Sequence, residues 1–194
     1  MDVIFLNGAS GSGKSSIARQ LQELSHQPYL HIGIDSIIGM MPSKLNNLTG
    51  ESANSGFYWR EVALNGGQRG FKIQKGEYAQ QLNTAYRKML QSLLQSGIRL
   101  IIDEVIDGDG EMQIWRRLLQ PFNCYYVAID CNLAQLQRRE IARGNRKLGS
   151  SSEQFYRVHQ GVDYDLRIDT HANSSSECAA LILCAIEDLK CNQL

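Results

Sequence analysis

A run of small residues near the start of the chain has the composition of a phosphate-binding loop. Residues 8–15 read GASGSGKS, which satisfies the pattern G-x-x-x-x-G-K-[ST]. Glycines in this pattern let backbone N–H groups point inward around a polyphosphate, while the lysine reaches the outer phosphates and the last hydroxyl can bind Mg²⁺. Lys14 is therefore expected to act in catalysis as well as in binding. The predicted nucleotide-binding residues of this segment are Gly8, Ala9, Ser10, Gly11, Ser12, Gly13, Lys14, Ser15 and Ser16.

The flanking residues support this interpretation. An apolar run of strand length, residues 3–6, precedes the loop, and an amphipathic helical pattern, residues 15–24, follows it. A helix that starts there adds its partial positive charge to the site. A dinucleotide-binding pattern G-x-G-x-x-G starting at Gly11 would need glycine where Ser16 stands, and it would not require a lysine. The remaining alternative is an ordinary flexible turn, which needs neither the strand nor the helix.

A candidate metal ligand follows another apolar run. In RLIIDEV, residues 99–105, three apolar residues precede Asp103, as in the Walker B pattern. The pattern alone is weak, because many buried strands end in an acidic residue that is simply solvated. In a parallel sheet, however, the end of this strand lies at the same edge as the loop after the first strand. We therefore predict that Ser15 and Asp103 bind Mg²⁺.

The acidic residue Asp35 follows the run YLHIGI, residues 29–34. If that run is a strand of the same sheet, its end also faces the phosphates. A carboxylate there could accept the proton of a substrate hydroxyl while the hydroxyl oxygen attacks the terminal phosphoryl group. Asp35 could equally cap a helix that starts at Ser36. The pattern alone leaves both readings open.

A basic cluster is the third candidate element of the site. The segment QRREIARGNRKLG ends a helical pattern and carries five cations: Arg138, Arg139, Arg143, Arg146 and Lys147. Arginines could close over the transferring phosphoryl group and neutralise its developing charge. We predict this role for Arg143 and Arg146, and a nucleotide contact for Arg139. The alternative is that these residues complement the dipole of the helix, with Gly144 as its cap.

Apolar runs of strand length alternate with helical periodicity along the chain. This alternation predicts an α/β fold in three layers, a parallel five-stranded sheet with helices on both faces. The last helix should begin with a capping box formed by Ser174 and Glu177, and Gly97 should cap the longest helix. The predicted strands are residues 3–6, 29–34, 99–105, 124–130 and 165–169. The predicted helices before the last are residues 15–24, 77–95, about 111–119 and about 133–143.

One segment interrupts the alternation. Residues 42–77 are polar and rich in glycine, yet they include four aromatic residues, Phe57, Tyr58, Trp59 and Phe71. A connection of this length in a compact domain is usually a lid or binding element, or else disordered, and the aromatic residues favour the former. We therefore predict a single domain, residues 1–194, with a lid or acceptor-binding insert at about residues 43–76.

The composition limits the partners. Lysine plus arginine and aspartate plus glutamate number 20 each, so no overall charge would draw the protein onto nucleic acid or an anionic membrane. We expect a small, locally bound ligand. No apolar run approaches the length of about 18 residues that a membrane span needs, and the first residues lack the basic segment of a signal peptide.

The residues that often bind metals or form disulfides show no such pattern. The five cysteines form no C-x-x-C pair and lie in apolar runs, which favours buried thiols in a reducing compartment, and we expect the cytoplasm. The four histidines have no zinc-binding spacing. The sequence DGDG, residues 107–110, lacks the further acidic ligands of a calcium loop and is interpreted as a turn.

Several stretches together resemble the chloramphenicol phosphotransferase-like family of P-loop kinases. They are FLNGASGSGKSS, GIDSIIGMMPSK, RLIIDEV, REIARGNR and VHQGVDYDLRIDT, in this order along most of the chain. All P-loop proteins share the first, whereas the second and the last are more particular to this family. The resemblance implies a fold similar to nucleotide monophosphate kinases and ATP-dependent phosphorylation, best described for the 3-hydroxyl of chloramphenicol. It also implies that Asp35, which matches the family's aspartate, is the base for the acceptor hydroxyl.

The chain departs from this family in two places. The family often has two aspartates where this chain has Asp103 and Glu104, and a glutamate at that position can orient water in ATPases. The insert at residues 43–76, where the acceptor should bind, matches least well. The fold and the phosphate site do not specify the acceptor.

Three functions follow from these residues. The leading hypothesis is an ATP- and Mg²⁺-dependent enzyme that moves the γ-phosphoryl group to a hydroxyl of a small molecule. The second is a nucleoside or nucleotide kinase with the same donor site. The third is a nucleotide-binding regulatory module or slow ATPase, in which Glu104 orients water and the insert contacts a protein partner. The presence of Lys14, Asp35 and Asp103 together favours catalysis over the third.

Overall fold

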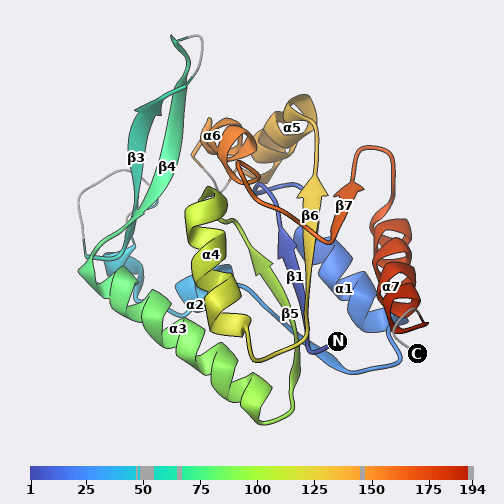
Figure 1. Ribbon diagram of the computed structural model, residues 1–194. Coiled ribbons are helices and arrows are strands. Elements are labelled where there is room, and N and C mark those ends of the chain that lie inside the picture. Colours follow the sequence, from blue (N-terminus) through green and yellow to red (C-terminus); the bar gives the residue numbers. More distant parts are fainter. Residues whose placement is uncertain (47, 49–54, 65–66, 145–146, 192–194) are drawn as a thin grey trace.

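The computed structural model describes residues 1–46, 48, 55–64, 67–144 and 147–191. Its centre is a five-stranded sheet in the order β2-β5-β1-β6-β7, in which all neighbouring strands run parallel (Figure 1). The parallel five-stranded sheet predicted from the sequence is therefore confirmed. Its strands are β1 (Val3–Asn7), β2 (Tyr29–Ile32), β5 (Arg99–Glu104), β6 (Cys124–Asp130) and β7 (Leu166–Asp169).

Helices cover both faces of the sheet, because successive residues of a strand point to opposite faces. In β1, Val3 and Phe5 belong to a core that residues of α3 and α4 complete. Ile4 and Leu6 belong to a second core, completed by α1 and α7 on the other face (Figure 1). The bounds of these helices are α1 (Lys14–Leu24), α3 (Glu77–Gln95), α4 (Gly108–Leu119) and α7 (Ser175–Cys191).

Aromatic packing fixes α3 and α4 against the sheet. Trp115 of α4 is buried, and its ring lies edge-on to Phe5 of β1, with ring centroids 5.3 Å apart. Tyr86 of α3 packs edge-on to the same indole at 6.2 Å. Edge-to-face pairs of this kind contribute about 0.5–1.5 kcal/mol each beyond their buried area. The two helices therefore offer rigid support to the polar side chains that they carry.

Two helices lie above the carboxyl ends of the strands, α5 (Leu133–Arg143) and α6 (Ser150–Arg157) (Figure 1). The sequence predicts α5 with these bounds, and Gly144 caps it with φ 63°. It does not predict α6, whose first residues are polar but buried. The Glu140 carboxylate of α5 stabilises this helix start by accepting hydrogen bonds from the backbone N–H of Gly149 (2.9 Å) and of Ser151 (2.8 Å). A contact of this kind leaves no periodic signal in the sequence.

The insert contains an antiparallel hairpin that the sequence interpretation misses. Its strands are β3 (Phe57–Ala63) and β4 (Arg69–Lys75), and they form a separate two-stranded sheet. The hairpin stands beside α3 and α6, away from the main sheet (Figure 1). Gly149, just before α6, passes so close that a Cβ there would lie 3.1 Å from the Arg69 carbonyl oxygen. A short 3-10 turn, Ser43–Leu45, precedes the described part of the hairpin.

Two local predictions are wrong. The strand predicted to end at residue 34 ends at Ile32, and α2 (Ile34–Gly39) begins two residues later with Gly33 at its cap position. Asp35 is therefore a residue of the first helical turn and not the cap of a helix that starts at Ser36. The sequence DGDG is not a turn outside a helix, because Gly108 already begins α4.

The capping predictions are confirmed for α7. Ser174 N–H and Oγ donate to Glu177 Oε2 at 2.8 and 2.7 Å, and Glu177 N–H donates back to Ser174 Oγ at 3.3 Å. The prediction that the cysteine thiols are buried is confirmed only in part. Cys131 and Cys178 are buried, Cys124 is half-buried, and Cys184 and Cys191 are exposed on α7. Within the described residues no helix has the length and apolar character to cross a membrane.

Candidate active site

The phosphate-binding loop joins β1 to α1, as the sequence predicts. Gly13 has φ 106°, a left-handed conformation that favours glycine, and α1 begins at the next residue, Lys14. The Lys14 side chain is 6% exposed, and its ammonium donates hydrogen bonds to the carbonyl oxygens of Gly8 (2.8 Å) and Ala9 (3.1 Å). The lysine is thus held at the amino end of a helix, where backbone N–H groups attract anions.

Ser15 and Asp103 meet beside this lysine. Ser15 Oγ donates a hydrogen bond of 2.6 Å to Asp103 Oδ2, and Lys14 Nζ lies 3.7 Å from Asp103 Oδ1. Burial alone would raise the pKa of Asp103, but the Lys14 ammonium and the hydrogen bonds that the carboxylate accepts hold it below its usual value. A hydroxyl and an ionised carboxylate are oxygen ligands of the kind that Mg²⁺ takes beside phosphates. The pair therefore fits this ion.

The chain passes very close to Asp103 before it reaches Asp35. The register pairs Ile32 of β2 with Ile102 of β5, so the next residues, Gly33 and Asp103, lie side by side. A Cβ on Gly33 would lie 2.4 Å from the Asp103 carbonyl oxygen, so only glycine fits this crossing. Two residues further on, Asp35 is exposed in the first turn of α2. The structure thus brings the two predicted carboxylates to one edge of the sheet.

Glu104 points to the other side of β5 and is buried. Its Oε1 accepts hydrogen bonds from the Tyr86 hydroxyl at 2.7 Å and from the Ile34 N–H at 3.1 Å. Burial raises the pKa of Glu104 to about 8, with the neighbouring Asp103 charge acting in the same direction. Gly33, at the cap position of α2, makes no side-chain cap bond, and Glu104 supplies the partner for the first N–H of the helix. Glu104 therefore ties α2, and with it Asp35, to α3.

The basic cluster divides into several environments. Arg139 Nη1 donates to the carbonyl oxygen of Gly11 at 2.7 Å, so this arginine braces the outside of the phosphate loop. Arg143 lines the central cavity, whereas Arg138 Nε donates to the carbonyl oxygen of its own helix at Ala134 (3.4 Å). The predicted residue Arg146 lies outside the described residues.

A cavity of about 500 Å³ lies where the loop, α2 and the hairpin meet, a volume typical of small-molecule sites. Four predicted residues, Gly8, Ala9, Ser12 and Arg139, do not line it. Its other walls come from the hairpin, α3, α4 and α6. The predicted residues that line it are Ser10, Gly11, Gly13, Lys14, Ser15, Ser16, Asp35, Asp103 and Arg143.

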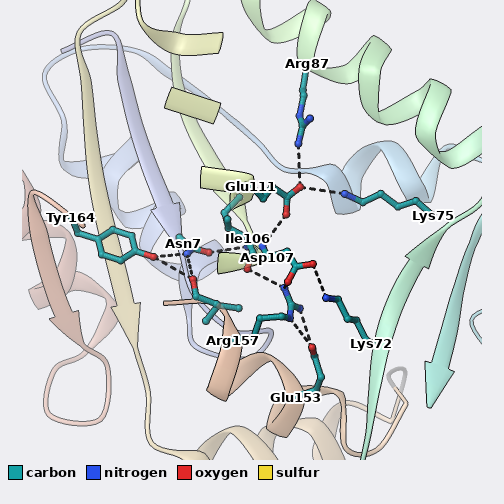
Figure 2. Close-up of polar contacts among 11 residues, drawn as sticks. Asn7, Lys72, Lys75, Arg87, Ile106, Asp107, Glu111, Glu153, Arg157 and Tyr164 are labelled. Carbon is teal, nitrogen blue, oxygen red and sulfur yellow. Dashed lines mark hydrogen bonds and ion pairs between the residues drawn. The ribbon is translucent and has the colours of Figure 1, made fainter. Parts of the chain in front are cut away.

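Four cations that the sequence did not single out line the same cavity, and together they are called the basic wall here: Lys72, Lys75, Arg87 and Arg157. Figure 2 shows them converging from β4, α3 and α6 on carboxylates of the α4 start. Lys75 Nζ and Arg87 Nη2 lie 3.3 and 3.1 Å from Glu111 Oε1. Lys72 Nζ lies 2.6 Å and Arg157 Nη1 3.0 Å from the two oxygens of Asp107.

Two further polar side chains were missed, because their partners are remote in sequence. The Gln154 side-chain oxygen accepts a hydrogen bond of 2.7 Å from the Ser10 N–H of the loop. Asn7, fully buried at the end of β1, donates from Nδ2 to the Val158 carbonyl oxygen (2.8 Å) and to the Tyr164 hydroxyl (2.6 Å) (Figure 2). Its Oδ1 accepts from the Ile106 N–H at 3.0 Å. These bonds hold α6 over the loop.

Known proteins are similar to this chain over most of its length. The family model described as "Chloramphenicol phosphotransferase-like protein" matches residues 1–187. Two proteins from strains of Mycobacterium tuberculosis, each named "Putative O-phosphotransferase", are 26% identical over 178 residues, which cover 91% of this chain and 78% of each relative.

Solved structures show the same fold at low identity. A sugar kinase from Janibacter sp. HTCC2649 has a TM-score of 0.63, with 13% identity over 96% of this chain and 95% of that chain. A gluconokinase from Sinorhizobium meliloti 1021 has a TM-score of 0.62, with 14% identity over 99% of this chain and 94% of that chain. The tunicamycin resistance protein of Deinococcus radiodurans has a TM-score of 0.64, with 15% identity over 95% of this chain and 94% of that chain. The chain belongs to the chloramphenicol phosphotransferase-like family, and it is a phosphotransferase with the fold of P-loop kinases.

Proposed function

We propose that this family member transfers the γ-phosphoryl group of ATP, in the presence of Mg²⁺, to a hydroxyl group of a small molecule. The observation that carries the proposal is the shared cavity, which Lys14, Ser15 and Asp103 line together with Asp35. A donor held by the loop and an acceptor beside Asp35 would therefore meet in one cavity. Phosphoryl transfer requires little more of a protein than such positioning and charge neutralisation.

The donor half would use the loop and its two neighbours. Loop N–H groups and the start of α1 would bind the phosphates, and the Lys14 ammonium would neutralise the outer ones. Ser15 Oγ and Asp103, 2.6 Å apart, would hold Mg²⁺. That ion would supply charge neutralisation between the outer phosphates. Arg143, on the cavity, would approach the transferring group, and the same role is proposed for Arg146 from the sequence.

The acceptor half would use Asp35 as the base. The acceptor oxygen forms a bond to the γ-phosphorus while the bond from phosphorus to the bridging oxygen breaks, and ADP leaves with that electron pair. The hydroxyl proton moves to the Asp35 carboxylate, which is exposed to the cavity. The names of the family and of the sugar kinase and gluconokinase support a small alcohol as acceptor.

Replacing Asp35 with asparagine tests the proposal. Asp35→Asn keeps the size of the side chain but removes the proton acceptor, so transfer should fall by about 10²–10⁴-fold. Affinity for ATP should stay within about twofold, because the donor residues are untouched. Coupled ADP release and isothermal titration measure the two quantities. Asp188→Asn, on the exposed side of α7, is the matched control. Turnover at the wild-type rate in Asp35→Asn would rule out this base.

The ATPase alternative has a separate test. If the chain only hydrolyses ATP, ADP should form at a rate that ignores every hydroxylated acceptor and falls in Glu104→Gln. The hydrogen bonds from Tyr86 and Ile34 and the raised pKa of Glu104 argue against its acting as a base for water. We therefore expect ADP formation to depend on the acceptor. Comparing nucleosides with other alcohols as acceptors in the same assay tests the hypothesis of a nucleoside kinase against that of a kinase for other small alcohols.

A further inference from the structure

We propose that the acceptor carries an anionic group, a carboxylate or a phosphate, in addition to its hydroxyl, and that Lys75 and Arg87 bind this group. The inference rests on the proposed function, since it concerns the acceptor half of the same cavity. It goes further by naming the chemical class of the acceptor and the residues that select it.

The first support is the way in which Lys75 and Arg87 share one partner. The two cations approach Glu111 from β4 and from α3, and both lie closest to the same oxygen, Oε1, at 3.3 and 3.1 Å (Figure 2). The other oxygen of Glu111 accepts the Asp107 N–H at 2.8 Å. Only one carboxylate oxygen is thus turned to the two cations. A second oxyanion placed between them would give each cation a partner of its own.

The second support is the balance of charge. The basic wall has four cations, and among the described residues its ion pairs join them to three carboxylates, those of Asp107, Glu111 and Glu153. Arg157 is neutralised by Glu153, whose two oxygens accept from Nε (2.6 Å) and Nη2 (3.0 Å). The excess positive charge therefore falls on Lys72, Lys75 and Arg87. The side chains of Lys75 and Arg87 are 34% and 16% exposed, so water screens this charge only in part.

The third support is a surplus of hydrogen-bond donors. Three nitrogen atoms of cavity-lining residues are buried without an acceptor among the described residues: Arg87 Nε, Trp59 Nε1 and Trp115 Nε1. Most buried donors in proteins have a partner. The Arg87 guanidinium also lies over the Trp115 ring, 5.0 Å from its centroid, which fixes the orientation of its donors. A ligand rich in acceptor oxygens would match this wall.

The other carboxylate groups of the cavity come from different elements. Glu104 also lines the cavity, but its Oε1 already accepts hydrogen bonds from the Tyr86 hydroxyl and the Ile34 N–H. Asp35 is at α2, whereas the two cations come from β4 and α3. The hydroxyl and the anionic group of the acceptor would thus face different elements. Phe57 and Trp59 of β3 line the cavity as well and would cover the carbon skeleton.

Direct titration tests the proposal. The full chain is first saturated with Mg²⁺ and a non-hydrolysable ATP analogue, so that added anions cannot report on the phosphate loop. Inorganic phosphate and lactate are then titrated separately. We expect at least one of them to bind at a single site. Phosphate alone would indicate a phosphorylated alcohol as acceptor, and lactate alone a hydroxy acid. Binding of neither anion to the wild type would overturn the proposal.

Variants assign the site. Lys75→Gln and Arg87→Gln should each weaken anion binding by about tenfold or more, because each removes a charge-assisted hydrogen bond. Arg87→Lys keeps the charge and should retain more of the affinity than Arg87→Gln. Lys88→Gln, one residue away on the exposed side of α3, should bind as the wild type does. Wild-type affinity in both glutamine variants would also overturn the proposal.

The donor analogue separates this inference from the proposed function. If the analogue itself fails to bind, the proposed function fails and the inference fails with it. If the analogue binds and neither anion does, only the inference fails. Bound analogue in Lys75→Gln and Arg87→Gln also demonstrates that these variants are folded. As a second measurement, glucose, gluconate and glucose 6-phosphate are compared as acceptors, and preference for the neutral sugar would count against an anionic acceptor.

Discussion

The two halves of the cavity are built in opposite ways. The proposed donor half is local: six residues between positions 10 and 16 supply most of it, and Asp103 joins them from the adjacent strand. The basic wall is assembled from β4, α3 and α6, over residues 72–157. Phosphates look alike in every donor, so a single stretch of backbone can bind them. Acceptors differ, and their wall depends on side chains that only tertiary packing brings together.

The halves also differ in how their charges are satisfied. On the donor side, the buried Lys14 ammonium bonds two loop carbonyls and faces one carboxylate. On the acceptor side, four cations share a smaller number of carboxylates. Gly33 and Glu104 join the halves, since one passes against Asp103 and the other holds α2 to α3. Changes in each half should therefore be separable, and changes at the joint should affect both.

The largest effect should come from the donor half alone. Lys14→Met removes the cation proposed to neutralise the outer phosphates, so kcat/KM should fall by about 10³-fold or more, with weaker ATP binding. Anion binding at the basic wall should remain. Coupled ADP release and titration measure these effects, with Arg19→Met on the exposed side of α1 as the control. Equal losses at both sites would refute the separation of the halves.

Glu104, one of the two residues that join the halves, should make the stability of the protein depend on pH. Burial raises the pKa of native Glu104 to about 8, whereas in the unfolded chain this carboxyl ionises near its ordinary value of 4.5. The native state thus binds the extra proton between these pKa values, and its stability falls as pH rises through this window. Glu104→Gln cannot ionise at this position. The free energy of unfolding of the variant, minus that of the wild type, should therefore increase by about a few kcal/mol between about pH 5 and about pH 8.5.

Urea unfolding at the two pH values measures this difference. Each variant is compared with the wild type at the same pH, which removes the contributions of the other carboxylates. Glu187→Gln, exposed on α7, should follow the wild type. A difference between Glu104→Gln and the wild type that is constant across this range would contradict the raised pKa.

Crowding at the same joint gives a smaller effect. In Gly33→Ala the new methyl group would lie 2.4 Å from the Asp103 carbonyl oxygen, and overpacking of this kind costs about 1–3 kcal/mol. The backbone at Gly33 is extended, so the loss comes from space and not from conformation. Because β2 and α2 must shift, the KM values of donor and acceptor should both rise. In Gly39→Ala the new Cβ would meet no atom within 4 Å, so this control variant should be as stable as the wild type or more stable. Thermal unfolding measures the difference.

The smallest effect should come from a site that belongs to neither half. Ser174→Ala removes the hydroxyl of the α7 capping box and should lower the free energy of unfolding by about 1 kcal/mol. Donor and acceptor constants should not change, because Ser174 and Glu177 are exposed and neither lines the cavity. Ser176→Ala, exposed in the first turn of α7, is the control. A change in either KM would indicate that the halves are coupled through the core.

The donor half could be predicted because each of its residues carries a local signal. The loop glycines, Lys14 and Ser15 are consecutive, and the rule that parallel strands end at one edge is enough to add Asp103. The sequence also predicts the correct edge of the sheet for Asp35, although it predicts a β2 that is two residues too long. The reason is that Gly33 has the dihedral angles of a strand, φ −143° and ψ 163°, without a strand partner in the described ladder. The roles of these residues stay predictions until they are measured.

The acceptor half could not be predicted, because its signals are tertiary. One local signal for the hairpin is the pair Asn-Gly at residues 65–66, between two segments that contain aromatic residues, because this pair is common in hairpin connections. From the sequence alone, Lys72 and Lys75 look like ordinary surface lysines. Only the packing of β4 near α3 and α4 shows that they line the cavity. Arg157 sits on α6, whose start depends on the Glu140 carboxylate. Periodicity cannot report a helix that a distant side chain begins.

The bonds of Asn7 have a consequence for synthesis. β1 is the first strand to leave the ribosome, yet it lies between β5 and β6, whose residues begin at 99 and 124. The Asn7 carboxamide reaches its last partner only when residue 164 has been made. Such distant pairings close slowly, because the intervening chain loses entropy before the contacts form. The strand that precedes the loop therefore stays without its neighbours in the sheet until β5 has been made, and its apolar residues are a target for chaperones during that time.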